Sequence, residues 1–82
     1  MPPSNYPLAE RLDLTGLKCP LPVLRANKVL RARDHGDVIE VTADDPATAK
    51  DFPAYCQTAG HALIEAREEA GGRFVFHIRK GG

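Results

Sequence analysis

The β-branched run Val38–Ala43 is the strongest strand signal in the chain, and it constrains the fold most. A shorter alternating segment, 11–14, precedes it and predicts another strand. Between the two we expect a helix from about Pro20 to Arg33, of which the part from Val23 on contains no Gly or Pro and is rich in helix formers. Two parallel strands joined by a helix form a βαβ unit, for which we expect a right-handed crossover.

The second half of the chain predicts one more helix and a hairpin. Residues 44–46 combine acidic N-cap residues with a Pro suited to the first helical position, and Gly60 is a typical stop. Pro53 should kink or split this helix. The alternating segments 61–68 and 73–79 are joined by a short Gly-rich link, which favours an antiparallel hairpin. The order β-α-β-α-β-β predicts a two-layer α/β sandwich: a mixed four-stranded sheet with two helices on one face.

Size and charge narrow the function classes. The 82 residues suffice for one small domain, which we place at 11–82 behind a flexible leader at 1–10. Eleven basic and eleven acidic side chains cancel, whereas nucleic-acid binders usually have a positive excess, so no direct nucleic-acid contact is expected. No apolar run approaches the ~18 residues of a membrane span, and no secretory signal is evident, so we expect a cytoplasmic protein.

The two cysteines are expected to have different roles. Cys56 lies on the apolar stripe of the second helix, where a thiol is usually buried and inert. Cys19 follows Lys18 at a strand-to-helix junction. The helix dipole and the lysine should lower its pKa from the ~8.5 of a free thiol toward roughly 3.5–7.5. Pro20 and Pro22 remove two N–H groups and stiffen the backbone, so we expect them to hold the thiol outward in support of the thiolate.

Other cysteine chemistries fit the sequence less well. A Cys-X-X-Cys pair is missing, so dithiol redox chemistry has no local resolving partner. A hydrolase would need a histidine partner in a deep cleft, and we expect His35, His61 and His77 to be surface or turn residues. The Cys and His spacing matches no common zinc motif, so neither a metal nor a cofactor is expected.

Two leucines of the first helix lie outside its apolar stripe. The stripe comprises Val23, Ala26, Val29 and Leu30. Leu21 and Leu24 fall on the side of Arg25 and Lys28. They either cover the helix end or are simply exposed, or they form a small apolar and basic docking surface beside the thiol.

The motif Cys19-Pro20-Leu21-Pro22, preceded by residues 14–18, resembles the TusA (SirA-like) family of sulfur-carrier proteins. Residues 43–48, residues 51–53 and Cys56 with Gly60-His61 resemble the same family, as does the ending 78–82. The likeness extends from about Leu12 to the C-terminus. It implies a two-layer α/β sandwich, in accord with the order of elements.

The resemblance also implies a function. Such proteins accept sulfane sulfur as a persulfide, here on Cys19, from a cysteine desulfurase or a rhodanese-like donor, and pass it to an acceptor relay protein. They are carriers more than turnover enzymes, and we expect a monomer. In the best-known branch the relay leads to 2-thiolation of the wobble uridine in certain tRNAs. Relatives in sulfur-oxidising bacteria serve dissimilatory sulfur metabolism.

Three alternatives remain open from the residues. The ending Gly81-Gly82 is shared by ubiquitin-like carriers that hold sulfur as a thiocarboxylate. Their fold opens with a hairpin, whereas this chain opens strand-helix-strand, so we expect a flexible end. A regulatory or binding module would use Cys19 only for packing. An RNA-contacting protein would use the basic residues of the first helix, namely Arg25, Lys28, Arg31 and Arg33.

Overall fold

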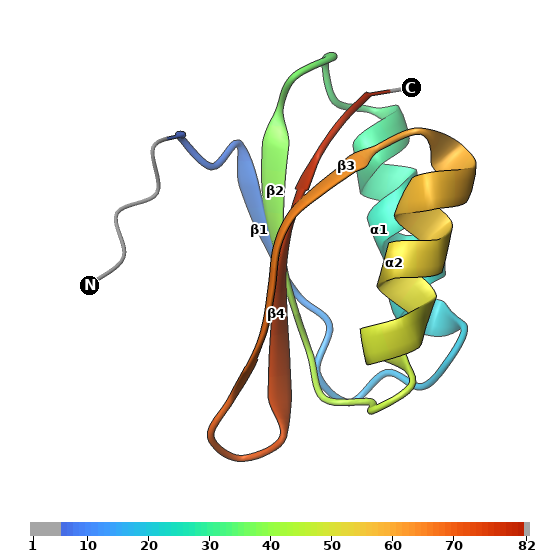
Figure 1. Ribbon diagram of the computed structural model, residues 1–82, viewed down its shortest axis with the longest axis vertical. Helices are drawn as coiled ribbons and strands as arrows, with labels where there is room; N and C mark the ends of the chain where they lie inside the picture. Colours follow the sequence, from blue (N-terminus) through green and yellow to red (C-terminus); the bar gives the residue numbers. More distant parts are fainter. Residues whose placement is uncertain (1–5, 82) are drawn as a thin grey trace.

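A computed structural model describes residues 6–81 and shows a mixed four-stranded sheet (Figure 1). The strands are β1 (Glu10–Asp13), β2 (Val38–Ala43), β3 (Ala62–Glu69) and β4 (Arg73–Arg79). Their order in the sheet is β1-β2-β4-β3. β1 pairs with β2 in parallel, and the other two pairings are antiparallel.

Two helices cover one face of this sheet, as Figure 1 shows. They are α1 (Leu21–Arg31), which joins β1 to β2, and α2 (Thr48–Ala59), which joins β2 to β3. The predicted two-layer α/β sandwich is therefore confirmed. Neither helix of the described chain is long and apolar enough to cross a membrane.

The course of α2 differs from the prediction in two respects. The helix begins at Thr48 instead of Pro46, because the preceding residues form a turn in which Thr48 donates its N–H to the Asp45 carbonyl at 2.9 Å. The helix also runs through Pro53 as one element and is not split. Pro53 has no N–H to donate to the Ala49 carbonyl, so the helix continues past it with one hydrogen bond fewer.

The core lies between the helices and the sheet. Phe52 of α2 and Phe76 of β4 are fully buried, with ring centroids 4.7 Å apart. Leu30 of α1 packs into the same cluster and is fully buried. Each such side chain contributes roughly 1.5–3 kcal/mol through the area it removes from water. This cluster holds both helices at fixed positions on the sheet.

The buried stripe of α1 begins one residue earlier than predicted, at Pro22 instead of Val23. Pro22 is buried together with Ala26 and Leu30, whereas Val23 and Val29 are half-buried against the core. Pro22 therefore anchors the start of the helix in addition to restricting its backbone.

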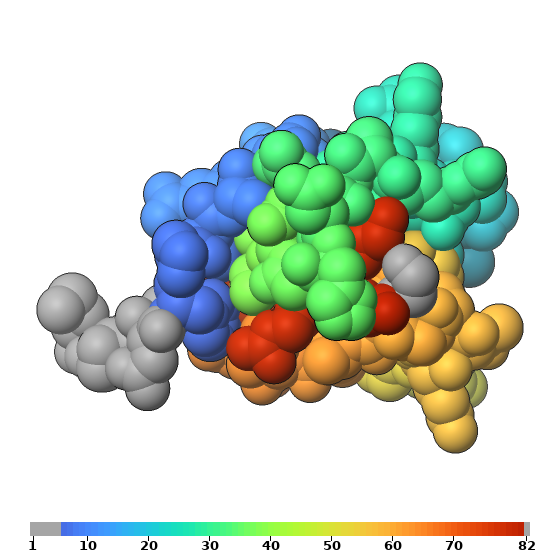
Figure 2. Space-filling model, turned by 90° about the horizontal axis from the view of Figure 1, so that it is seen from above, coloured from blue at the N-terminus to red at the C-terminus, as the bar shows by residue number. Residues whose placement is uncertain are grey.

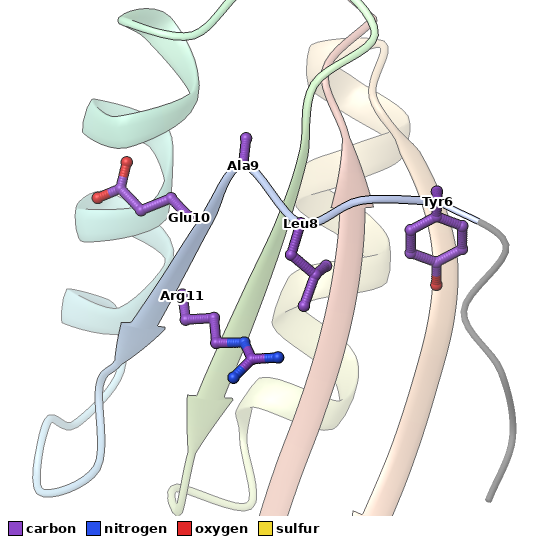
Figure 3. A pocket seen from close by; sticks show the side chains of 5 residues that line it. All are labelled: Tyr6, Leu8, Ala9, Glu10 and Arg11. Atoms are coloured by element: carbon purple, nitrogen blue, oxygen red, sulfur yellow. The ribbon is translucent and has the colours of Figure 1, made fainter.

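The segment before β1, which the sequence analysis places in a flexible leader at 1–10, packs on the other face of the sheet. The Tyr6 hydroxyl is 2.6 Å from Nδ1 of His77, and Ala9 donates its N–H to the Val38 carbonyl at 2.7 Å. Figure 3 shows the Tyr6 and Leu8 side chains over the strands. Residues 1–5 lie outside the described chain.

His77 is not the surface residue that we expected. Its side chain is 4% exposed, and Nε2 is 3.0 Å from Oε2 of Glu40. Both ring nitrogens therefore have a partner, since Nδ1 faces the Tyr6 hydroxyl. The strand register explains the burial, because β4 places His77 between β2 and β3, opposite Glu40 and Glu65.

The C-terminal end is fixed at Gly81, so the expected flexible end is wrong at this residue, while Gly82 lies outside the described residues. Gly81 donates its N–H to Nδ1 of His61 at 3.0 Å, and a Cβ at Gly81 would overlap the Gly60 carbonyl. Burial and the charge of Lys80 lower the pKa of His61, which favours the neutral ring that can accept this bond. In Figure 2 the last residues (red) lie beside the loop after α1 (green).

Candidate functional site

Cys19 lies in the loop from β1 to α1. This loop is in the lower half of Figure 1. The residue is exposed, and its peptide bond to Pro20 is cis. Gly16, in the same loop, has a φ of 86°, a conformation that glycine adopts without strain. The thiol is therefore presented at the surface by a loop with a defined backbone.

Two carboxylates from the segment after β2 hold this loop. Asp45 accepts the Cys19 N–H at 2.7 Å through Oδ2 and the Ala47 N–H at 3.2 Å through Oδ1. Asp44 accepts the Gly16 N–H at 2.9 Å. These hydrogen bonds tie the cysteine loop to the start of α2.

The sequence prediction did not assign a role in the site to either aspartate, although a signal was available. β1 and β2 are parallel neighbours, so their carboxyl ends meet at one edge of the sheet. Acidic residues directly after β2 are then placed to meet the loop that follows β1. The local pattern alone predicts for Asp44 and Asp45 only the cap of the second helix.

The start of α1 offers few unpaired N–H groups. Pro20 and Pro22 have none, as the sequence shows, and the structure adds that Leu21 donates its N–H to the Lys18 carbonyl at 2.7 Å. Backbone N–H groups are the main anion-binding groups of a helix N-terminus. The helix end is thus a weaker support for a thiolate than the sequence suggested.

The electrostatic surroundings of Cys19 contradict the expected low pKa. The carboxylate of Asp51 raises the pKa of Cys19, and desolvation and the charge of Asp45 raise it further. The positive charge of Lys18 instead helps to lower the pKa of Asp45. The free protein therefore favours the thiol form of Cys19.

Cys56 has the inert position that we predicted. It is 2% exposed within the core, and burial raises its pKa to about 11. Because Cys56 is buried, Cys19 is the accessible thiol among the described residues. No group of three His, Cys, Asp or Glu side chains in residues 6–81 is placed to hold a metal ion.

The candidate docking residues share one exposed face of α1. Leu21 and Leu24 are 47% and 55% exposed. Arg25 and Lys28 are also exposed, and the spacing of the four residues places them on neighbouring turns. Among the described residues, neither Arg25 nor Lys28 has an acidic partner within 4 Å. This face begins two residues after Cys19.

The fold and the exposed, anchored cysteine define a class of small two-layer α/β proteins. The crystal structure of a SirA-like protein from Desulfitobacterium hafniense superimposes with a TM-score of 0.78 at 27% identity, over 89% of this chain and 99% of that one. The family model of the sulfurtransferase TusA matches residues 10–80. The chain belongs to the TusA family.

Relatives in this family are similar along most of their length. The sulfur carrier protein TusA of Allochromatium vinosum is 49% identical over 71 residues, which are 87% of this chain and 92% of the relative. The sulfur carrier protein TusA of Pseudomonas paraeruginosa is 41% identical over 76 residues, which are 93% of this chain and 95% of the relative.

Proposed function

We propose that this protein is a sulfur carrier that holds sulfane sulfur as a persulfide on Cys19. The observation that supports the proposal most is an exposed cysteine on a loop fixed by Asp45, in a member of the TusA family. Relatives of nearly the same length are named sulfur carriers. A bound sulfur at this position would be accessible to another protein.

The chemistry of the carrier needs two exchanges. In the first, the Cys19 thiolate attacks the outer sulfur of the donor's persulfide, the donor's sulfur–sulfur bond breaks, and the donor leaves as a thiolate. In the second, an acceptor thiolate attacks the outer sulfur on Cys19, and Cys19 leaves as a thiolate. The sulfur changes bonding partner twice and no external oxidant or reductant is consumed.

The neighbours of Cys19 have supporting roles in this proposal. Pro22 is buried and Pro20 precedes the first helical residue, so they fix the backbone that presents the sulfur. Lys18 is exposed and its charge acts on Asp45, so we assign it to the loop's charge balance. None of these residues encloses the sulfur.

We further propose that the exposed face of α1 is the docking surface. Leu21 and Leu24 supply apolar area, and Arg25 and Lys28 supply cationic groups beside the thiol. The donor is a cysteine desulfurase or a rhodanese-like protein, and the carrier acts as a cytoplasmic monomer. We expect neither a nucleic acid nor a membrane to be a partner of this surface.

The proposed pathway is a relay that leads to 2-thiolation of the wobble uridine in tRNA. We expect the wild-type gene to restore 2-thiouridine in cells that lack their own TusA-type carrier, as measured by mass spectrometry of tRNA nucleosides. Cys19→Ser should restore none, because it has no thiol to hold the sulfur. Cys56→Ala should restore the modification, since Cys56 is buried in the core.

The two possible failures of this experiment have different meanings. Restoration by Cys19→Ser would show that a persulfide on Cys19 is not needed. If the wild-type protein is expressed and folded but restores nothing, the tRNA branch is wrong, and sulfur delivery to another pathway has to be tested.

A further inference from the structure

The segment before β1 is bound across the face of the sheet that the helices leave uncovered. Residues 6–9, which we call the strap, run from the start of β1 across the strands to Tyr6 (Figure 3). Near β1, Ala9 donates its N–H to the Val38 carbonyl at 2.7 Å. At the far end, the Tyr6 hydroxyl is 2.6 Å from Nδ1 of His77, and the two rings pack edge-on with centroids 5.6 Å apart. The strap is therefore bound to a titratable side chain.

His77 has a carboxylate on either side of it in the sheet. On β2, Oε2 of Glu40 is 3.0 Å from Nε2 of the ring. On β3, Oε1 of Glu65 is 3.9 Å from Nδ1. The imidazole side chain between them is 4% exposed, so a change in its charge takes place almost out of contact with water.

Arginines lie beyond both carboxylates. Arg11 of β1 is 3.8 Å from Glu40. Arg67 of β3 pairs with Oε2 of Glu65, the oxygen that does not face the histidine. On β4 itself, Arg79 is the next residue on the same face and is exposed. The charged groups that face the imidazole ring from the neighbouring strands are thus the two carboxylates.

These partners decide which nitrogen of the neutral ring carries the proton. An ionised carboxylate only accepts hydrogen bonds, so Nε2 of His77 donates its N–H to Glu40. Nδ1 of the neutral ring is then an acceptor, and the Tyr6 hydroxyl donates to it. Within residues 6–81, that hydroxyl makes this one hydrogen bond. The strap is therefore bound to the neutral form of His77.

Protonation of Nδ1 changes this arrangement. Both nitrogens of an imidazolium are donors, so the ring no longer accepts the hydrogen of the Tyr6 hydroxyl. The acceptor that Nδ1 then needs is present, because Oε1 of Glu65 faces it. Hydrogen bonds between ionised partners are roughly twice as strong as neutral ones. The charged ring thus has a better partner in Glu65 than in Tyr6.

We propose that His77 is a pH-sensitive switch for the strap: the neutral ring binds Tyr6 and holds residues 6–9 on the sheet, and acidification pairs Nδ1 with Glu65 and releases them. Imidazole suits this role because its charge ordinarily changes between about pH 5 and 8. Release exposes the face of the sheet that the strap covers. The inference stands apart from the carrier function, since none of these residues belongs to the cysteine loop or to α1.

The first test follows the Ala9 amide by NMR hydrogen exchange at about pH 8 and about pH 5. The rate is expressed as a protection factor relative to an unstructured chain at the same pH, so the intrinsic pH dependence of exchange cancels. We expect this factor to fall about ten-fold on acidification, the effect of losing one hydrogen bond that holds the strap. Leu14, which donates its N–H to the Thr42 carbonyl at the same 2.7 Å at the other end of β1, should keep its protection.

The second test locates the protons on the isotope-labelled ring of His77 by NMR. At about pH 8 we expect a neutral ring with its proton on Nε2, and at about pH 5 a proton on both nitrogens. His35→Asn removes an exposed histidine after α1 and should change neither this result nor the exchange of Ala9.

Two variants separate the roles of the partners. Tyr6→Phe keeps the aromatic ring and removes only the hydroxyl, so the protection of Ala9 should be about ten-fold lower already at neutral pH and should fall no further on acidification. Glu65→Gln removes the charged acceptor, so acidification should lower the protection of Ala9 less than in the wild type. Thermal unfolding checks that both variants are folded.

Four results would overturn the switch. A proton on Nδ1 of the neutral ring contradicts the acceptor role of His77, and a ring that is still neutral at about pH 5 contradicts its titration. An unchanged protection factor of Ala9 in the acidified wild type contradicts release of the strap. A pH-dependent fall that persists in Tyr6→Phe contradicts the role of the hydroxyl. Sulfur transfer enters none of these measurements, so the carrier function stands or fails independently.

Discussion

Asp45 connects two parts of the site with one carboxylate. One oxygen accepts the N–H of Cys19, and the other accepts that of Ala47, just before α2 begins. Both bonds favour the ionised carboxylate, and they are the main reason that its pKa is lowered from the ordinary 3.8. The conformation of the cysteine loop is therefore linked to the charge of a residue on another segment.

We expect Asp45→Ala to lower the thermal unfolding midpoint at neutral pH. Because the pKa of Asp45 is lower in the folded state, its contribution is present above 3.8 and is lost as the pH falls through the folded value. The difference in unfolding midpoint between wild type and Asp45→Ala should therefore shrink at the acid end of a pH series. Differential scanning calorimetry measures the two midpoints.

Asp34→Ala serves as the control for this experiment, because Asp34 is exposed and lies far along the chain from the cysteine loop. It should leave the midpoint almost unchanged. A difference between Asp45→Ala and wild type that is constant over the whole pH series would contradict the linkage.

At the residue scale, the sequence predicted the exposure of Cys19 but not its environment. The exposure of Cys19 and the burial of Cys56 follow from local patterns in their helices and loops. The pKa of Cys19 does not, since the groups that raise it belong to Asp45 and Asp51 on another element. The local sequence predicts that Lys18 is the dominant charge acting on the Cys19 thiol. In the fold, the carboxylates of Asp51 and Asp45 act on it instead and raise its pKa.

At the element scale, α1 presents two different faces. Pro22, Ala26 and Leu30 fill the core, whereas Leu21 and Leu24 are exposed. Large apolar side chains beside a reactive group are typical of a docking surface, although single exposed leucines also occur on ordinary surfaces. A substitution that slows sulfur transfer without destabilising the fold would distinguish a docking surface from ordinary exposed leucines.

We expect Leu24→Ala to slow sulfur transfer from a cysteine desulfurase by about five-fold or more, which corresponds to roughly 1 kcal/mol of lost interface burial. Unfolding should be affected by less than about 0.5 kcal/mol, because the side chain is largely exposed. Initial rates of labelled transfer and chemical denaturation measure the two effects.

Leu30→Ala is the matched control on the same helix. It should destabilise the fold by about 2–5 kcal/mol, because the side chain is fully buried. If Leu24→Ala leaves the transfer rate unchanged, α1 is not the docking surface for this donor.

Patterns along the chain predicted the strands closely and the second helix less well. Alternation and β-branching locate the sheet residues, because each strand has one face in the core. The start of α2 is set by the turn in which Thr48 donates its N–H to the Asp45 carbonyl. The register shift between Leu63 and Glu65 in β3 is also set by pairing with β4, which a local pattern does not contain.

At the scale of the whole molecule, the order of the strands creates the site. The parallel pair β1 and β2 brings the cysteine loop and the two aspartates to one end of the sheet. The order of elements along the chain predicted the layers but left the order β1-β2-β4-β3 undetermined, because several pairings satisfy the same pattern. Within that order, the parallel pairing of β1 with β2 places Asp44 and Asp45 beside the loop.

The same arrangement separates the cysteine loop from the end of β4. The loop between β1 and α1 lies in the lower half of Figure 1, whereas the chain after β4 runs to the top. Gly81 is fixed through its bond to His61.

The most direct measurement is the mass of the sulfur-loaded protein, mapped to peptides before and after a mild thiol reductant. We expect one added sulfur on the peptide that contains Cys19, complete loss of it on reduction, and no loading of Cys19→Ser. A modification that resists reduction and maps to Gly82, or an added sulfur on Cys56 with Cys19 unmodified, would contradict a persulfide carrier.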